Sequence, residues 1–343
     1  MLKIINFMHE FNFFLILLIN LPILFFYNSI TKKLNFFDLS DGSRKFQEKP
    51  VPLIGGFLLI YNILVFQILS LNDVFGYDIN EYFSNTRELF GFYLGLLFCF
   101  FVGAFDDKYD LSATKKLFIN FFIIFLIILL DENLIIRELN FSFFENKIEL
   151  RNISTLFTIL CFLLLINAIN MFDGINLQVG IYCLIIFSIF IIKNLFPILS
   201  LIVIISLIIF LYYNFKNKAY LGDSGTQSLA FIISYIFIKS YNENFAFRPE
   251  EIFILLAIPG LDMFRLFIFR IIKGKNPFSA DLNHMHHLIL RKYNSFIALI
   301  VISILILINI GIYYLIANKA FVLLVTLLSY IFLLIFFRKQ IRK

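Results

Sequence analysis

Long apolar runs recur along nearly the whole chain, and they constrain its fold more than any other feature. A helix that crosses the hydrocarbon core of a bilayer needs about 20 predominantly apolar residues. Eleven stretches reach or approach that length, and they span residues 11–28, 53–71, 89–105, 116–130, 153–170, 179–192, 196–213, 226–239, 251–272, 295–316 and 320–337. We therefore expect an all-α, polytopic integral membrane protein with about eleven transmembrane helices.

Composition excludes the soluble class. The chain is 61% hydrophobic and 15% charged, whereas soluble domains are about 45–50% apolar and about 25% charged. The net charge of +6 is explained by the Lys and Arg that cytoplasmic loops carry, so we expect no nucleic-acid partner. No internal repeat interrupts the pattern, and we assign one domain, residues 1–343.

Loop charge sets the orientation. If the basic C-terminal tail is cytoplasmic, eleven spans place the N-terminus outside, and most Lys and Arg residues then lie inside. An even number of spans would not give this asymmetry. The same topology places residues 131–152 outside, where Leu139, Phe141 and Phe143 alternate with polar residues before a second alternation begins at Ile148. This pattern predicts a short β-hairpin in an outside loop.

Five polar clusters interrupt the apolar pattern, and the topology places all five on the cytoplasmic side. They comprise residues 44–56, 105–111, 167–176, 220–227 and 276–293. Polar and ionisable groups near a bilayer are costly, so each cluster requires an explanation. Because the clusters are scattered along the chain yet share one predicted face, we interpret them as one composite site.

Adjacent carboxylates define the second cluster. Asp106 and Asp107 repel each other unless a cation or a shared proton relieves the cost, and Asp110 follows one helical turn later. Mg²⁺ prefers oxygen ligands, often one or two carboxylates together with substrate phosphates. The alternative is a solvated loop.

The third cluster repeats polar residues every three positions. Asn167, Asn170 and Asp173 share one side of a predicted helix end. Gly174 follows, and we expect the helix to break there, as in broken helices that supply ion ligands within membranes. A polar packing stripe between helices is the alternative.

Glycine shapes the fourth and first clusters. Gly-Asp-x-Gly at 222–225 predicts a tight turn that projects Asp223 and opens a helix whose N–H groups suit a phosphate. A simple helix cap would explain it equally. The Pro and Gly residues of 44–56 indicate either a shaped loop or merely the start of a helix.

The fifth cluster holds His284, His286 and His287. Zinc would require further ligands at suitable spacing, so recognition of a sugar or diphosphate through ring N–H donors is the simpler hypothesis. A chance group of solvated histidines is the alternative. Since their spacing does not place all three on one helical face, we expect an extended or turned loop. In the preceding apolar run, Asp262 and Arg265 are expected to form a structural ion pair.

In this order the clusters resemble the polyprenyl-phosphate N-acetylhexosamine-1-phosphate transferases of glycosyltransferase family 4. The resemblance covers about residues 38–293 and rests on Pro-x-Pro-x-x-Gly-Gly, Asp-Asp-x-x-Asp-Leu, Asn-Ala-x-Asn-x-x-Asp-Gly, Leu-Gly-Asp-x-Gly and Pro-Phe-Ser-x-Asp-x-x-His-x-His-His. The sister branch, which transfers phospho-MurNAc-pentapeptide, typically carries three consecutive histidines. Here Met285 interrupts them, which is similar to the amino-sugar branch.

The resemblance implies roles for individual residues. Asp106, Asp107 and Asp223 match catalytic carboxylates, and Asp223 with Asn170 matches the Mg²⁺ ligands, with Mn²⁺ as an alternative ion. The residues implied or assigned to bind substrate are Lys116, Asn167, Asp173, Asn176, His284, His286 and His287.

The implied enzyme is a Mg²⁺-dependent phospho-sugar transferase. It would pass an N-acetylhexosamine 1-phosphate, GlcNAc-1-phosphate foremost, from a UDP-sugar to undecaprenyl or another polyprenyl phosphate, releasing UMP. This step initiates cell-surface polysaccharides such as O-antigen or teichoic acid. The implied setting is the inner membrane, with a cytoplasmic active site and a homodimer. A phospho-MurNAc-pentapeptide transferase and a secondary transporter are the alternatives.

Five positions depart from the family pattern. Asn176 and Leu177 replace an Asp and a Gly in the segment that ends at Gln178, Gln47 and Leu53 replace a His and an Arg, and Leu282 replaces an Arg. These departures affect the predicted identity of the sugar more than that of the reaction.

Overall fold

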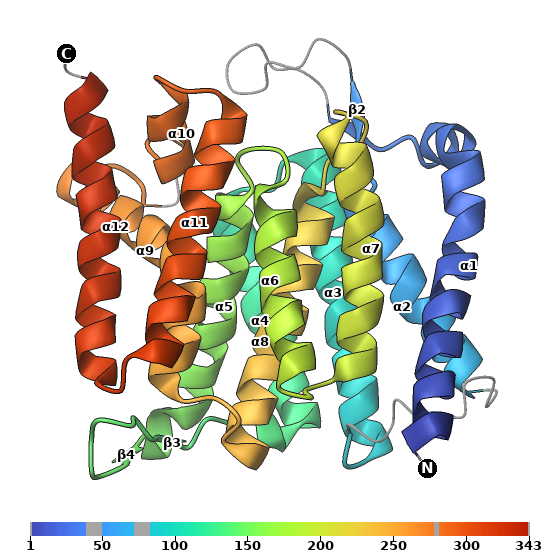
Figure 1. Cartoon of the computed structure of the whole chain (residues 1–343), viewed down its shortest axis with the longest axis horizontal. Coiled ribbons are helices and arrows are strands. Elements are labelled where there is room, and N and C mark those ends of the chain that lie inside the picture. The colour runs from blue at the N-terminus through green and yellow to red at the C-terminus, as the bar shows by residue number, and fades with distance from the viewer. Residues whose placement is uncertain (1, 39–49, 72–82, 278–280, 342–343) are drawn as a thin grey trace. The chain divides into compact units, whose positions relative to one another are not determined.

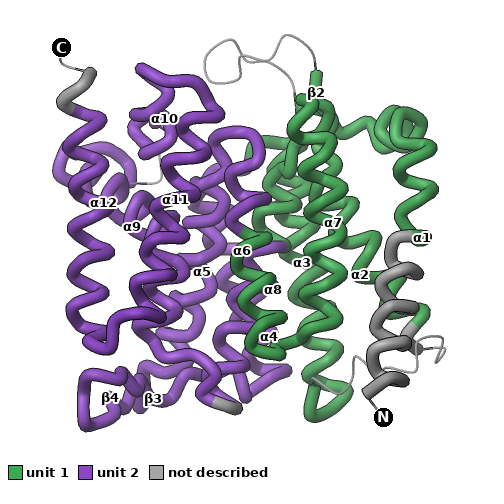
Figure 2. The backbone as a smooth tube through the Cα atoms, viewed as in Figure 1, with its two compact units in different colours: residues 1–110, 183–228 green, residues 111–182, 229–343 purple. Residues whose placement is uncertain are grey.

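The computed structural model describes residues 2–38, 50–71, 83–277 and 281–341. The chain forms two compact units, each built from two segments (Figure 2). Unit 1 comprises residues 1–110 and 183–228, and unit 2 comprises residues 111–182 and 229–343. The assignment of one domain stays a prediction. Residues 44–49 of the first polar cluster, Gln47 among them, lie outside the described residues.

Unit 1 is a helical bundle in which α2 packs against α1, α3 and α7 (Figure 1). Its helices are α1 (Leu2–Leu34), α2 (Gly55–Leu71), α3 (Thr86–Tyr109), most of α6 (Gln178–Ile192), α7 (Pro197–Phe215) and the first turns of α8 (Gly222–Asn244). Two short strands, β1 (Phe37–Asp38) and β2 (Val51–Pro52), pair antiparallel. The sequence analysis did not predict these strands.

Unit 2 is a second helical bundle, in which α9 contacts α5, α11 and α12. Its elements are α4 (Ala113–Leu130), η2 (Glu132–Leu134), β3 (Glu138–Leu139), β4 (Ile148–Glu149), η3 (Arg151–Ile153), α5 (Ser154–Phe172), the rest of α8, α9 (Pro249–Ile272), α10 (Met285–Leu290), α11 (Ser295–Leu315) and α12 (Lys319–Ile341). The short helix α10 packs on α11 and α12.

Each of the eleven predicted apolar runs lies within one helix to within two residues at its ends, but eleven spans are not confirmed. Seven helices of the described chain are long and apolar enough to cross a membrane, and two apolar helices, α2 and α6, are shorter. The seven are α3, α4, residues 151–172 around α5, α7, α9, α11 and residues 319–338 of α12. The protein is therefore a multi-pass membrane protein.

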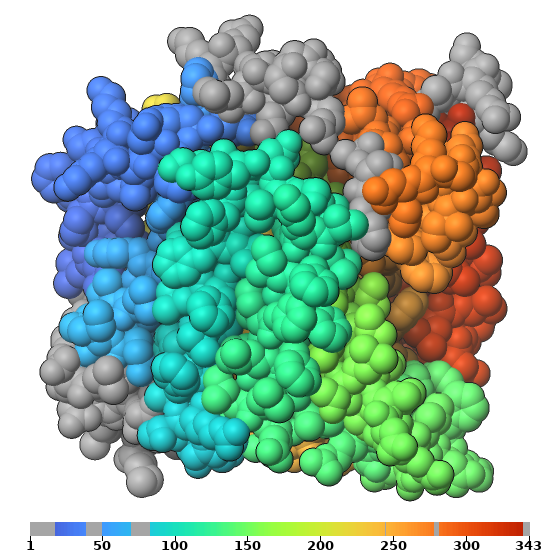
Figure 3. Space-filling view, turned by 180° about the vertical axis from the view of Figure 1, so that it is seen from behind, coloured from blue at the N-terminus to red at the C-terminus, as the bar shows by residue number. Residues whose placement is uncertain are grey.

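Helices α4 and α8 show why apolar length alone does not identify every span. Helix α4 exposes Phe118, Phe122 and Phe125, and its segment lies open at the surface in Figure 3. Such a face suits lipid. In contrast, every residue of 224–241 in α8 is buried, so this helix is surrounded by protein and can carry polar groups.

The predicted outside loop contains the expected hairpin. Strands β3 and β4 pair antiparallel, with Leu139 opposite Ile148. The strands are shorter than the alternation suggested, because Phe141, Phe143 and Phe144 form a ring cluster with centroids 5.1–6.1 Å apart. The hairpin is therefore confirmed, whereas its side of the membrane stays a prediction.

A buried charge pair joins α8 to the end of α4 in unit 2. Lys239 Nζ lies 3.2 Å from Asp131 Oδ2, and both side chains are fully buried. The Tyr235 hydroxyl donates to the same carboxylate oxygen at 2.6 Å, and Glu243 lies 3.3 Å from Lys239. Removing one partner would leave a buried charge uncompensated, so this pair fixes the helix packing.

Candidate active site

The acidic cluster of unit 1 is organised by Asp107, near the end of α3. The backbone N–H of Asp223 donates to Asp107 Oδ1 at 2.7 Å, and that of Ser224 donates to Oδ2 at 3.1 Å. The first N–H groups of a helix have no partner within it, and a carboxylate at that end is favoured by the helix dipole. Asp107 therefore caps α8 and fixes the turn that carries Asp223.

Glycines allow this close approach. Gly222 has φ +72°, which favours glycine, and a Cβ there would lie 2.7 Å from Asp107 Oδ2. A Cβ at Gly103 would collide with the backbone of Asp223 and Ser224. Gly103 and Gly222 are thus required by the contact between α3 and the first turn of α8.

The described part of the first cluster, residues 50–56, forms hydrogen bonds with the segment that leads into α8. Gly55 and Gly56 N–H donate to the carbonyls of Tyr220 and Leu221 at 3.1 and 3.3 Å. The Tyr220 N–H donates to the Pro52 carbonyl at 2.9 Å. Three of the five polar clusters, distant in sequence, therefore converge within unit 1, whereas a single composite site of all five stays a prediction.

The donor chemistry of unit 1 fits a hard cation. Asp106 and Asp223 are half-buried carboxylates, while Asp107 is engaged with backbone N–H groups. Among the described residues, no group of three or more His, Cys, Asp or Glu is arranged to hold a metal. Mg²⁺ commonly takes one or two carboxylates with waters and substrate phosphates, so the oxygen donors fit Mg²⁺ better than zinc.

In unit 2, the end of α5 carries the third cluster. Helix α5 ends at Phe172 and α6 begins at Gln178, so the predicted break at Gly174 is confirmed. Asn167 Nδ2 donates to the Leu163 carbonyl of its own helix at 2.7 Å. Asp173 is exposed, whereas Asn170 and Asn176 are half-buried.

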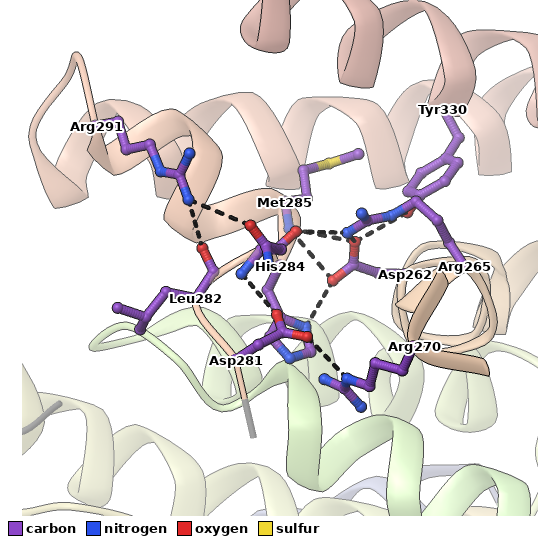
Figure 4. A network of polar contacts seen from close by, with 10 residues as sticks. Asp262, Arg265, Arg270, Asp281, Leu282, His284, Met285, Arg291 and Tyr330 are labelled. Carbon is purple, nitrogen blue, oxygen red and sulfur yellow. Dashed lines mark hydrogen bonds and ion pairs between the residues drawn. The ribbon is translucent and has the colours of Figure 1, made fainter. Parts of the chain in front are cut away.

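Asp262 of α9 is the centre of a hydrogen-bond network (Figure 4). Its Oδ1 accepts from Arg265 Nη2 at 2.7 Å and from the Tyr330 hydroxyl at 2.9 Å. Its Oδ2 lies 2.9 Å from His284 Nδ1, and the Met285 N–H donates to both oxygens at 3.2 and 3.3 Å. The predicted Asp262–Arg265 ion pair is confirmed, but it also holds the histidine segment.

Two arginines of α9 fix the chain that leads to the histidines. Arg265 Nη2 donates to the Asn283 carbonyl at 2.7 Å. Arg270 Nε donates to Asp281 Oδ2 at 2.8 Å, and Arg270 Nη1 donates to the Pro277 carbonyl at 2.8 Å. These contacts hold Pro277, Asp281 and Asn283 against α9, and the contact of Asp281 with Arg270 is drawn in Figure 4.

The expectation of an extended or turned loop for the three histidines is wrong. His284 is the N-cap of α10, and His286 and His287 lie within that helix. The helix forms because Asp262 accepts the Met285 N–H and because Met285, Leu288 and Ile289 are buried. Local spacing of histidines could not reveal an acceptor that lies on another helix.

The histidine rings form a compact group against the end of α5. His284 and His286 stack with centroids 5.3 Å apart, and His286 lies 4.3 Å from His287. A Cβ at Gly174 would collide with the His286 ring, so the third and fifth clusters meet in unit 2. Burial, together with the neighbouring His287 and His284, holds the pKa of His286 well below its usual value.

The remaining predicted residue, Lys116, lies half-buried in the first turns of α4 in unit 2. The residues that the sequence analysis missed are Arg270, Asp281 and Tyr330, together with the bracing role of Asp262. Asp281 offered a signal, because it belongs to the quoted Pro-Phe-Ser-x-Asp motif. The catalytic, substrate-binding and metal-binding roles all stay predictions.

Comparison with known proteins supports the sequence resemblance. Residues 89–241 match the sequence model described as Glycosyl transferase family 4. An undecaprenyl-phosphate alpha-N-acetylglucosaminyl 1-phosphate transferase of Escherichia coli O157:H7 is 26% identical over 280 residues, covering 78% of this chain and 72% of that protein. The Yersinia pestis protein of the same name is 26% identical over 291 residues, covering 80% of this chain and 75% of its own. Over residues 89–241 the chain is therefore similar to glycosyl transferase family 4, and over most of its length it is similar to these two transferases.

Proposed function

We propose that this chain transfers an N-acetylhexosamine 1-phosphate, GlcNAc-1-phosphate foremost, from a UDP-sugar to undecaprenyl phosphate and releases UMP. The relatives, which are named undecaprenyl-phosphate alpha-N-acetylglucosaminyl 1-phosphate transferases, support this reaction. The observation that carries it is the capped turn at Asp223, which lies inside the family-matched segment together with Asp106 and Asp107.

The reaction joins a phosphate oxygen of the lipid to the β-phosphorus of the UDP-sugar, and the bond from that phosphorus to UMP breaks. Such transfers depend on alignment and charge neutralisation more than on covalent chemistry. A lipid monophosphate is largely ionised near neutral pH, since its second pKa is about 6. Asp106 is therefore assigned to positioning the acceptor and to removing a remaining proton.

Positive charge and hydrogen-bond donors are assigned to the diphosphate. Lys116 supplies a cation, and the first N–H groups of α8 suit a phosphate. The histidines, with Asn167, Asp173 and Asn176, are assigned to the sugar nucleotide.

A divalent ion fits this chemistry. Asp223 is the proposed first ligand, and Asn170 retains its predicted supporting role. When bound, Mg²⁺, or Mn²⁺ in its place, would neutralise charge on the diphosphate. We further propose that the enzyme resides in the inner membrane with its active site on the cytoplasmic face, that it acts as a homodimer, and that its product initiates a cell-surface polysaccharide.

The test uses purified protein in detergent, with undecaprenyl phosphate, Mg²⁺ and a panel of UDP-sugars. We expect UMP release with UDP-GlcNAc, and we expect Asp223→Asn to abolish it while the variant remains folded. Asp110→Asn is the matched control, because Asp110 is exposed and adopts the left-handed conformation that Asn tolerates. Full activity of Asp223→Asn at saturating Mg²⁺ would refute the assignment.

The same panel separates the alternatives. Activity only with UDP-MurNAc-pentapeptide would indicate the sister reaction. Substrate movement across proteoliposomes without UMP formation would indicate a transporter, whose substrate sites usually lie near the middle of the bilayer.

A further inference from the structure

The bonds around Asp262 do more than balance the charge of Arg265. An ionised carboxylate offers only acceptor sites. Because Oδ2 lies 2.9 Å from His284 Nδ1, that ring nitrogen must carry the proton. The geometry therefore fixes both the orientation of the His284 ring and the nitrogen that is protonated, and it leaves Nε2 as the nitrogen able to meet a ligand.

Two other side chains hold the carboxylate in place. Arg265 and Tyr330 both donate to Oδ1, and Arg265 Nε also donates to the Tyr330 hydroxyl at 3.0 Å. The Asp262 side chain is about 4% exposed and that of His284 about 10% exposed. These contacts hold the carboxylate in one orientation, which in turn fixes the direction of its hydrogen bond to the His284 ring.

Ring stacking couples the position of His286 to that of His284. The two rings stack with an interplanar angle of 4°, and His286 packs against Gly174. Among the described residues, His286 Nε2 is buried without a hydrogen-bond partner. A buried polar atom without a partner is costly, and because Nε2 faces Gly174, a ligand could bond to it only after the turn at Gly174 moves.

We propose that Asp262 is a positioning residue that sets the tautomer and orientation of His284, and through the ring stack places His286 for recognition of the diphosphate-sugar donor. This inference rests on the proposed function for its kinetic consequence, but its structural claim can be tested alone. Arg265 and Tyr330 keep Asp262 in this orientation through their hydrogen bonds to Oδ1.

The structural test is nitrogen NMR of the protein labelled with ¹⁵N at its histidines, with His284→Asn used to assign the signal. In the wild type we expect His284 to be protonated at Nδ1. In Asp262→Asn, whose amide can donate as well as accept, we expect that signal to change. An unprotonated Nδ1 in the wild type, or an unchanged signal in Asp262→Asn, would overturn the proposal whatever the enzyme does.

Asp131→Asn is the matched control. Asp131 is also a buried carboxylate of unit 2 that accepts from a tyrosine hydroxyl and pairs with a cation, but with Tyr235 and Lys239. We expect it to lower stability while leaving the His284 signal unchanged. A change of the same kind in this control would show that general loosening, rather than the Asp262 contact, sets the tautomer.

The kinetic test measures donor and lipid dependence separately. We expect Asp262→Asn to lower kcat/KM for the UDP-sugar by about 10- to 100-fold, the size of losing a charge-assisted hydrogen bond, with the lipid KM unchanged. Tyr330→Phe, which keeps the carboxylate, should give a smaller loss in the same direction and serves if Asp262→Asn does not fold.

The outcomes separate the two proposals. An altered His284 signal with unchanged donor kinetics would refute the role in donor recognition. A wild type that forms no UMP from any UDP-sugar would refute the proposed function, whereas the NMR result would still decide the structural claim.

Discussion

Replacing Asp107 by Asn tests the contact that organises the acidic cluster. The Asp107 carboxylate accepts N–H groups from Asp223 and Ser224 at 2.7 and 3.1 Å. An Asn side chain can accept only through its amide oxygen, so one N–H of the α8 turn loses its acceptor and the other loses a charged partner. Nothing else in the fold needs to change, since the two side chains have nearly the same shape.

The expected magnitude follows from the bond that is lost. A hydrogen bond to a charged group contributes about 1.5–3 kcal/mol, and about 1.4 kcal/mol corresponds to a tenfold change in an equilibrium constant. If the turn must be ordered for Asp223 to act, kcat should fall by about 10- to 150-fold. Thermal unfolding in detergent should show a loss of stability in the same variant.

The assay is UMP release at saturating donor, lipid and Mg²⁺, with Asp110→Asn beside Asp107→Asn. Asp110 lies one helical turn from Asp106 and is exposed, so its replacement controls for a lost negative charge near the site. We expect it to retain nearly full kcat. If the kcat of Asp107→Asn stays within about twofold of wild type, the loss is far smaller than the expected one of about 10- to 150-fold. That result would refute the capping role.

Three further predictions follow from other contacts. Lys239→Met should lower the free energy of unfolding by about 3–5 kcal/mol because it leaves a buried carboxylate unpaired, whereas Lys147→Met at an exposed pair should cost under about 1 kcal/mol; equal losses in thermal unfolding would contradict this. His286 has a depressed pKa, so the unfolded state binds its proton first and stability should fall as pH drops below about 6.5. His286→Gln should flatten that fall in Tm, and an unchanged pH dependence would argue against it. Cysteines at Asp110 and Asn146 should be labelled from opposite sides of the membrane, and labelling from one side would refute the topology.

Local pattern predicted much of this fold. Apolar run length located eleven helical segments, and Gly174 located the end of α5. The three-residue spacing of Asp262 and Arg265 predicted their ion pair, because residues three apart on a helix are neighbours. These features depend on short stretches of chain, whose geometry the local sequence determines.

Contacts between distant segments were not predictable in the same way. Asp131 and Lys239 are 108 positions apart, and each alone resembles an ordinary polar residue at the end of an apolar run. The α10 helix was missed because its first N–H is accepted by Asp262, 23 positions earlier. The family motifs indicated which residues gather, but not which of them, such as Asp107, serve to hold another in place.

The central claim is that a sugar 1-phosphate moves to the lipid, which requires UMP as the leaving group. The direct measurement is to supply UDP-N-acetylglucosamine labelled in the sugar, with undecaprenyl phosphate, and to quantify UMP, UDP and labelled lipid in the same reaction. The account predicts UMP and a lipid-linked sugar in equal amounts, with negligible UDP. Release of UDP in proportion to labelled lipid would mean that the sugar alone is transferred, and would contradict it.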